Sequence, residues 1–166
     1  PCLPFLCPPV AQCQLAALCR RSPSPSPWGG PYLRNKKGCL LANFKPGRGN
    51  YPEDGGLYTV RADAYWPNDF GVYNMAGNVA EWTSSLYYEG GYNFQHDLNP
   101  DIRYNAKDQD PQRMKRKVIR GGSWKDVGYF LQTSTRAYEY RDPSKAYIGF
   151  RCVIDLLPVT IKRGKK

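Results

Sequence analysis

Cysteine and histidine are scarce where a thiol or metal site would need them. The chain has six cysteines, but none lies between Cys39 and Cys152, and its only histidine is His96. Copper(I) is selected by soft thiolates, and zinc or iron sites need several thiolates or imidazoles. One histidine without a supporting motif also gives little support for Ser-His-Asp catalysis. The sequence therefore argues against thiol and histidine-rich metal chemistry in the middle of the chain, and we expect His96 to be an exposed polar residue.

The chain also lacks a long hydrophobic run. No stretch of about 18 apolar residues occurs, so we expect no membrane-spanning helix. The sequence starts at Pro1 and shows neither the charged nor the apolar region of a secretory signal peptide. We therefore expect the sequence to be a fragment of a longer chain.

Glycine and proline, in contrast, are abundant, with 16 glycines and 15 prolines in 166 residues. Turn signals separate short patterned segments, which predicts one loop-rich α+β domain, or part of one. β-branched and aromatic residues predict strands over Lys117–Trp124 and Ala146–Ile154, and a short helix could end the segment Asn74–Leu86. The polar segment Tyr87–Lys115 has no periodicity and is expected to be a long surface excursion.

Positive charge exceeds negative charge, giving a formal net charge of +10. Much of it lies in Arg113–Arg120 and Lys162–Lys166. No recognisable nucleic-acid-binding module accompanies these runs, so we expect no nucleic-acid partner. A solvated strand face, or a surface that faces a partner protein or an anionic membrane, is the better interpretation of this charge.

The first 26 residues differ from the rest of the chain. They contain Cys2, Cys7, Cys13 and Cys19, followed by the alternation SPSPSP. These cysteines lack the C-x-x-C spacing of a structural zinc site. We expect this atypical segment, 1–26, to be foreign to the domain, as a mis-joined or frame-shifted translation would be. The coherent domain then covers 27–157, and a basic tail covers 158–166.

Three motifs carry most of the functional information. They are GVYNMAGNVAEWT at Gly71–Thr83, RGGSW at Arg120–Trp124 and IGFRCV at Ile148–Val153. Together they resemble the C-terminal half of a formylglycine-generating-enzyme (FGE-sulfatase) domain, over about Pro27 to Asp155. The resemblance implies an α+β fold that is related to C-type-lectin-like domains and has little regular secondary structure.

Two loop segments offer the oxygen ligands that calcium prefers. The resemblance implies one calcium site at positions that bind calcium in the enzymes of the family, here Asn74, Gly77, Val79 and Glu81. It implies a second site at Asn43, Phe44, Asp54 and Gly56. Both ions would be structural and would clamp loops that have few backbone partners. From the residues alone, a cap with a surface carboxylate, or an Asx-turn at Asp54, remains the alternative.

The enzymes of this family use copper and a pair of cysteines placed just after the GGS-aromatic segment. Here Asp126 stands near the first of those positions and Leu131 near the second. A hard carboxylate and an aliphatic side chain cannot hold copper(I). We therefore expect a family member that lacks catalytic residues and copper, and that is not an enzyme.

Cys39 and Cys152 correspond to a similar cysteine pair that is bonded in the family. The resemblance therefore implies a disulfide, which would need an oxidising compartment and would stabilise the fold by roughly 4 kcal/mol in the chain-entropy model. The alternative is two buried free thiols that act as small hydrophobic groups. Three arginines near aromatic and acidic residues are expected to be structural forks: Arg120, Arg136 and Arg151.

A narrower resemblance covers GGSWKDVGYFLQTSTRAYEYRDPSKAYIGFRCV. This segment looks like the gliding-motility and type IX secretion lipoproteins of the GldK/PorK kind, which carry an FGE-like domain without the cysteines. The resemblance implies a homo-oligomeric ring with a GldN/PorN-like partner at the periplasmic face of the bacterial outer membrane, with the lipid anchor upstream of this chain. The loop Tyr87–Tyr104 and the RMKRK run are then candidate partner surfaces.

Two other functions remain open at this point. One is a ligand-binding module, because C-type-lectin-like domains display variable loops. The other is an active formylglycine-generating oxidase, which the absence of the cysteine pair disfavours.

Overall fold

The computed structural model describes residues 25–52, 55–92 and 102–153. Regular structure within these ranges consists of four strands, β1 (Ala80–Leu86), β2 (Arg116–Arg120), β3 (Ala137–Tyr140) and β4 (Ile148–Gly149). It also includes three single-turn 3-10 helices, η1 (Glu89–Tyr92), η2 (Gln112–Lys115) and η3 (Gly128–Leu131). None of these helices is long and apolar enough to cross a membrane. Several predictions fall outside the described residues, namely those on Asp54, His96, residues 1–24 and the tail 158–166.

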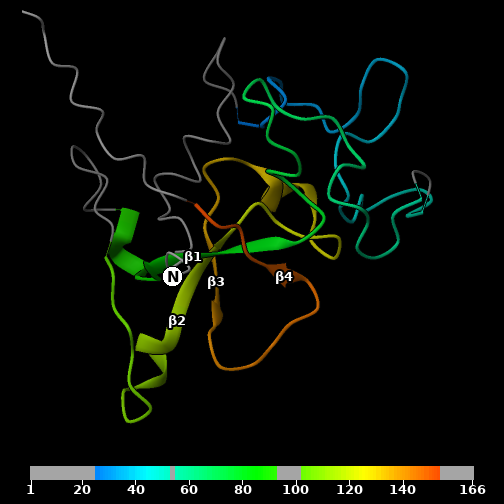
Figure 1. Ribbon diagram of the computed structural model, residues 1–166. Helices are drawn as coiled ribbons and strands as arrows, with labels where there is room; N and C mark the ends of the chain where they lie inside the picture. The colour runs from blue at the N-terminus through cyan, green and yellow to red at the C-terminus, as the bar shows by residue number, and fades with distance from the viewer. Residues whose placement is uncertain (1–24, 53–54, 93–101, 154–166) are drawn as a thin grey trace, which may run out of the picture.

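The four strands form one mixed sheet in the order β3-β2-β1-β4 (Figure 1). β2 pairs antiparallel with both β1 and β3, whereas β4 pairs parallel with β1. In this register Glu81 lies between Arg120 on β2 and Gly149 on β4. The three sequence motifs, far apart along the chain, therefore meet at Glu81.

The short helix expected at the end of Asn74–Leu86 is wrong, because this segment forms strand β1. Trp82 and Thr83 favour strands, and the Thr83 hydroxyl donates a hydrogen bond of 2.9 Å to the Val118 carbonyl of β2. The register with β2 is irregular between Trp82 and Leu86. Such an irregularity breaks the period of two, which explains why alternation does not reveal this strand in the sequence.

The predicted strand Lys117–Trp124 is confirmed in part, since β2 begins one residue earlier and ends at Arg120. Gly121 and Gly122 follow with φ angles of 87° and 67°. These left-handed conformations turn the chain out of the sheet, and glycine adopts them readily. Of the predicted strand Ala146–Ile154, residues 146–153 are described, and among these the two residues of β4 pair in the sheet.

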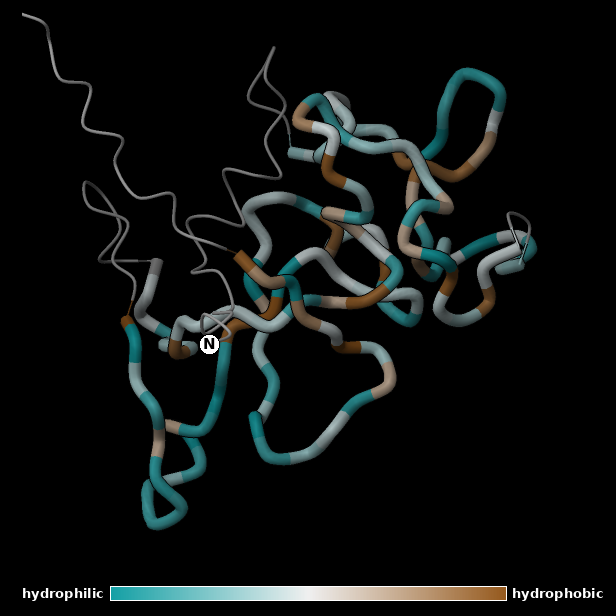
Figure 2. Tube along the Cα trace, in the orientation of Figure 1, coloured by the Kyte–Doolittle hydropathy of each residue, from teal (hydrophilic) through white to brown (hydrophobic). Residues whose placement is uncertain are grey.

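The buried apolar cluster is small and is built mainly by loops. It consists of Leu40, Ala42, Phe44, Ala76 and Leu131, with Trp28 and Leu33 packed against it. Figure 2 shows hydrophobic positions as short segments scattered among hydrophilic ones. The low content of regular structure agrees with the loop-rich fold expected from the glycine and proline content.

Leu131 tests how much this cluster contributes to stability. Its side chain is 2% exposed, so we expect Leu131→Ala to lower the free energy of unfolding by about 2–5 kcal/mol. Val127 lies just before η3 and is 45% exposed, so Val127→Ala should cost about 0.5 kcal/mol. Urea denaturation measures both, and equal losses for the two variants would contradict this description of the core.

Candidate functional site

Two loops cross at Asn43 and Gly77 with their backbones in direct contact. The Asn78 N–H donates to the Asn43 carbonyl at 2.7 Å. Gly77 has a φ of 80°, and a Cβ atom there would lie 2.5 Å from the Asn43 carbonyl oxygen. Only glycine permits so close an approach at this φ. The structure thus joins the two segments in which calcium ligands were predicted.

Two buried asparagine side chains extend this crossing to a third loop. Asn78 accepts a hydrogen bond from the Val60 N–H at 2.9 Å and donates to the Val60 carbonyl at 3.0 Å. The Asn43 amide donates to the Tyr58 carbonyl at 2.6 Å. These two amides satisfy backbone groups of Tyr58 and Val60, which a neighbouring strand would bond in a sheet. Sequence reasoning missed Asn78, although the Gly77-Asn78 pair inside the first motif is a turn signal that could have identified it.

The second predicted calcium set is brought together in part. A Cβ atom on Gly56 would lie 3.0 Å from the Asn43 side-chain oxygen, so this oxygen faces the glycine loop. Phe44 follows directly and is buried in the apolar cluster. Asp54, the charged member of the set, lies outside the described residues. A calcium ion at this site stays a prediction.

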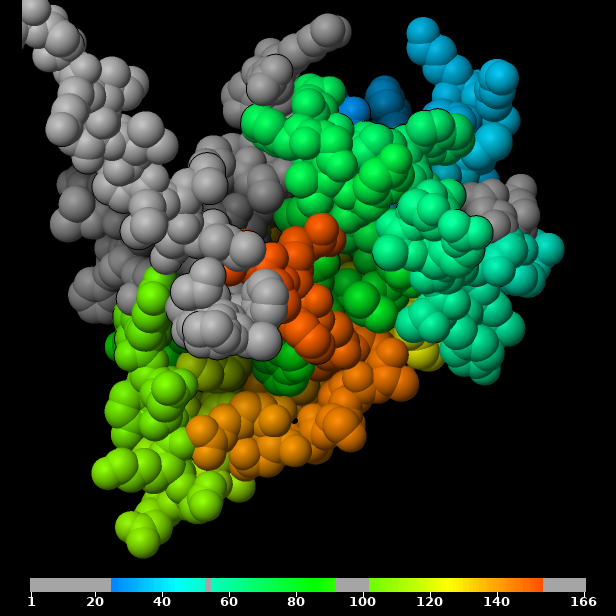
Figure 3. Space-filling model, in the orientation of Figure 1, coloured from blue at the N-terminus to red at the C-terminus, as the bar shows by residue number. Residues whose placement is uncertain are grey.

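The first predicted set centres on Glu81, whose carboxylate is bound by Arg151. The Arg151 Nη2 donates to Glu81 Oε1 at 2.7 Å, and its Nε lies 3.1 and 3.2 Å from the two oxygens. The same guanidinium donates to the Tyr73 carbonyl at 2.9 Å. Figure 3 shows the C-terminal end of the described chain beside the segment that precedes β1. Any cation bound by Glu81 would therefore share this carboxylate with Arg151.

The donor types around Glu81 suit a hard cation. Asn74 has a φ of 49°, and its amide nitrogen donates to the Ala62 carbonyl at 2.8 Å. Gly77 and Val79 would contribute backbone carbonyls. The described residues contain no cluster of three or more His, Cys, Asp or Glu side chains. An ion here would thus depend on one carboxylate and several neutral oxygens, a combination that calcium accepts. This site also stays a prediction.

Asp126 and Leu131, which stand near the positions expected for a cysteine pair, both have structural roles. Asp126 Oδ2 accepts hydrogen bonds from the Ser123 N–H at 2.9 Å and from the Ser123 hydroxyl at 2.5 Å. The Asp126 carbonyl accepts the Lys45 N–H at 2.9 Å. Asp126 therefore closes the turn after RGGSW and ties it to the loop after Phe44, while Leu131 fills the apolar cluster.

Arg120 is a structural fork, as its sequence context predicted. Its side chain is buried, with the residue 6% exposed. The guanidinium donates to the carbonyls of Thr133, Ser134 and Thr135, which follow η3. These bonds satisfy backbone oxygens that have no strand partner, so Arg120 holds η3 against the end of β2.

Cys39 and Cys152 are both free and exposed in the structure. The bridge implied by the resemblance is therefore not formed here. Oxidation of this pair in the natural protein stays a prediction.

Comparison with known proteins identifies the family. The family described as sulfatase-modifying factor enzyme 1-like (FGE-sulfatase) matches residues 19–156. The chain belongs to this family. Formylglycine-generating enzyme from Mus musculus is 34% identical over 138 residues, which is 80% of this chain and 34% of the mouse protein. A Bos taurus protein described as an inactive Cα-formylglycine-generating enzyme 2 is 30% identical over 132 residues, 76% of this chain and 36% of the bovine one.

The solved structures support the same fold. PvdO from Pseudomonas aeruginosa superposes with a TM-score of 0.63 at 21% identity, covering 88% of this chain and 51% of PvdO. The predicted FGE-like α+β fold with little regular secondary structure is confirmed. The chain spans about a third of the length of the mouse and bovine relatives.

A cavity that sequence reasoning missed lies beside Asp126 in this FGE-family domain. It measures about 130 Å³ and is lined by β1, β2, β3 and the segment around η3. The Tyr147 hydroxyl donates to Glu139 Oε2 at 2.8 Å. Burial raises the pKa of Tyr147, and the hydrogen bond to Glu139 adds to this effect. Burial opposes ionisation of Glu139, but hydrogen bonds from Tyr140 and Tyr147 outweigh it, so the Glu139 pKa is lowered.

The crossing of the two loops gives a stability test with a matched control. Gly77 and Gly38 have similar φ angles, 80° and 87°, but the space around Gly38 is open. Gly38→Ala should cost about 1 kcal/mol for the left-handed backbone alone. Gly77→Ala adds a clash with the Asn43 carbonyl and should cost about 2–4 kcal/mol. Thermal or urea unfolding of both variants measures the difference, and equal costs would show that the close approach is not tight.

Proposed function

We propose that this chain is the FGE-like part of a non-catalytic scaffold protein. The observation that carries this proposal is the role of Asp126 and Leu131. Asp126 closes a turn and Leu131 packs in the apolar cluster, so both side chains stabilise the fold. No cysteine occurs in the sequence between Cys39 and Cys152, so the segment that contains Asp126 and Leu131 supplies no thiol of its own. The chain then keeps the family scaffold without copper-thiolate chemistry.

We also propose the assembly in which this scaffold protein works. We propose a component of a type IX secretion and gliding-motility ring, at the periplasmic face of the bacterial outer membrane, with a GldN/PorN-like protein as partner. The support is the resemblance of Gly121–Val153 to ring lipoproteins of the GldK/PorK kind. A lipid anchor on another part of the protein would hold it at the membrane, and no nucleic acid takes part.

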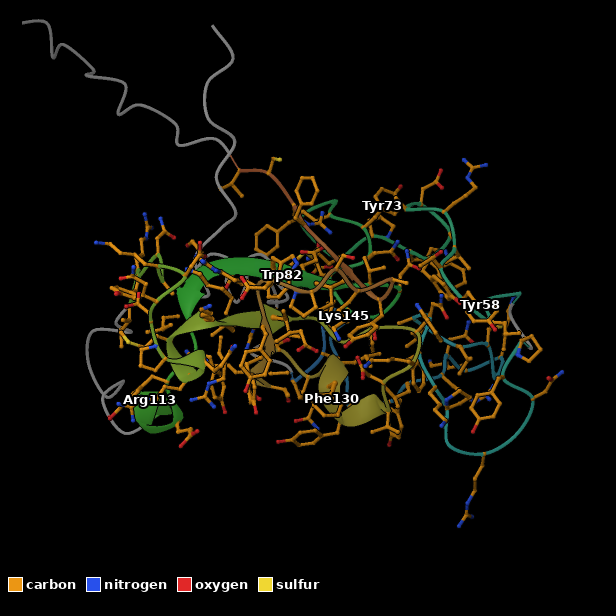
Figure 4. The ribbon with its side chains drawn as sticks, turned by 90° about the horizontal axis from the view of Figure 1, so that it is seen from below. Tyr58, Tyr73, Trp82, Arg113, Phe130 and Lys145 are labelled. Atoms are coloured by element: carbon orange, nitrogen blue, oxygen red, sulfur yellow. The ribbon has the colours of Figure 1, made fainter. Side chains whose placement is uncertain are left out.

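Hydrogen bonds within the domain guide which residues of the candidate surfaces we propose as partner contacts. Lys115, Arg116 and Lys117 in the RMKRK run are bonded within the domain, to backbone carbonyls or to the Glu89 carboxylate. Arg113 remains exposed, and Tyr88 is 52% exposed. Arg116 connects the two, because it donates to the Arg113 carbonyl and to Glu89 beside Tyr88. Figure 4 shows Arg113 at one end of the molecule, far from Tyr58.

A pull-down of the full-length protein from cell envelopes, followed by negative-stain microscopy, tests the assembly. We expect co-purification with a second ring protein in large rings. The double substitution Tyr88→Ala with Arg113→Glu should abolish co-purification, because aromatic and arginine side chains anchor interfaces. Arg48→Glu changes the same charge in a distant exposed loop and should leave the rings intact. A monomer without a partner would contradict the ring function.

Calcium binding is the second part of the proposal. We propose that the sets around Glu81 and around Asn43 each hold one structural calcium ion. Calcium at about 100 times its Kd should stabilise the protein by about 2.7 kcal/mol per site, seen as a higher Tm than in chelator. Glu81→Gln should reduce this calcium-dependent difference, whereas Asp69→Asn, an exposed carboxylate in another loop, should not. A Tm that does not respond to calcium would contradict both sites.

A further inference from the structure

The cavity beside Asp126 has the composition of a cation-binding cage. Its lining residues include the aromatic residues Phe130 and Tyr147 and the buried Arg120. Tyr138 borders the cavity too, but its ring packs against Tyr87 and Arg116, on the other face of β3 from Glu139. Two carboxylates also line it, from Glu139 and Asp126. Aromatic faces attract ammonium groups through the ring quadrupole, and nearby carboxylates add charge attraction. At about 130 Å³, the space exceeds the roughly 30 Å³ share of one water molecule and admits a small headgroup.

The chain places one of its own ammonium groups in this cage. Lys125 Nζ lies 3.3 Å from the centre of the Tyr147 ring. Tyr147 is held in place by its hydrogen bond to Glu139, whose other oxygen accepts the Tyr140 N–H at 3.0 Å. Lys125 itself is exposed and has a flexible stem, so it can leave the ring without disturbing the fold.

We propose that this cavity binds an ammonium group and that Lys125 occupies it in cis until a ligand displaces it. The ligand chemistry is a compact ammonium headgroup, carried either by a free small amine or by a lysine side chain of another polypeptide. The site lies beside the Asp126 turn and does not depend on the proposed ring assembly. Because Lys125 occupies the cavity, a ligand must compete with its ammonium group in order to bind.

The local charges become more favourable to an added cation once Lys125 leaves. Glu139 carries a lowered pKa and is ionised at neutral pH, and Asp126 adds a second carboxylate. Lys145 is the other positive group that acts on Glu139 and Tyr147. Figure 4 marks Lys145, before β4, and Phe130 of η3 in this part of the molecule. Arg120 also lines the cavity, and its guanidinium donates to the carbonyls of Thr133, Ser134 and Thr135. Without Lys125 the two carboxylates balance Arg120 and Lys145, so the cavity loses its excess positive charge and becomes more favourable to an added cation.

The experiment removes the internal occupant and adds cations of two kinds. Lys125→Ala protein is titrated with methylammonium and, separately, with Nα-acetyl-lysine N-methylamide, while NMR follows the Tyr147 ring signals. We expect the variant to bind at least one probe about tenfold more tightly than the unaltered chain, as loss of a competing cation–π contact implies. Tighter binding of the blocked lysine indicates a polypeptide ligand, and equal or tighter binding of methylammonium indicates a free amine.

Three matched variants make the result specific. Lys125→Arg keeps a cation on the ring and should bind as weakly as the unaltered chain. Lys45→Ala removes a lysine that lies 5.9 Å from the Tyr51 ring elsewhere and should also change nothing. Adding Glu139→Gln to Lys125→Ala should abolish the gain, with circular dichroism confirming that the fold is kept. If Lys125→Ala binds neither probe, or if Glu139→Gln leaves binding unchanged, the proposed cage is wrong.

Discussion

The approach of Gly77 to the backbone of Asn43 is the constraint on which the rest of the structure depends. Asn78 follows with a φ of 68°, which aims its side chain at Val60 and its carbonyl at the Trp124 N–H. The Gly77 N–H donates to the Gly121 carbonyl at 2.8 Å, so the RGGSW turn is fixed at the same point. Irregular loops must satisfy their backbone groups without a sheet. Here one crossing does so for three loops.

This constraint explains how a chain of the family can keep its scaffold without a thiol pair. The RGGSW turn is held by Gly77 on one side and by the Asp126 carboxylate on the other. Arg120 and Leu131 secure η3 through backbone carbonyls and apolar packing. Each of these contacts is made by the chain itself, and none uses a cysteine. The same region can therefore serve as a rigid platform for a partner or a ligand, which is the function we propose.

The sequence predicted the fold class and the family, because its three motifs resemble those of the FGE-sulfatase family. Two of these motifs contain glycines, Gly77, Gly121 and Gly122, whose positive φ angles other residues rarely adopt. The sequence predicted β1 wrongly, since the irregular register between Trp82 and Leu86 removes the alternation that marks a strand. It also placed Asn43 and Gly77 in separate sites, although the structure joins them, because loop crossings leave no periodic signal. Glu139 and Tyr147 could not be paired from sequence, since only the arrangement of β3 and β4 brings these residues together.

The central claim is that the natural protein does not carry out the oxidation for which its family is named. The most direct test incubates the full-length protein with copper, oxygen and a sulfatase-type peptide that contains the target cysteine. Mass spectrometry then follows the conversion of that cysteine to formylglycine. Our account predicts no conversion above the level without protein, because Asp126 and Leu131 cannot hold copper(I). Catalytic turnover that scales with protein concentration would contradict it.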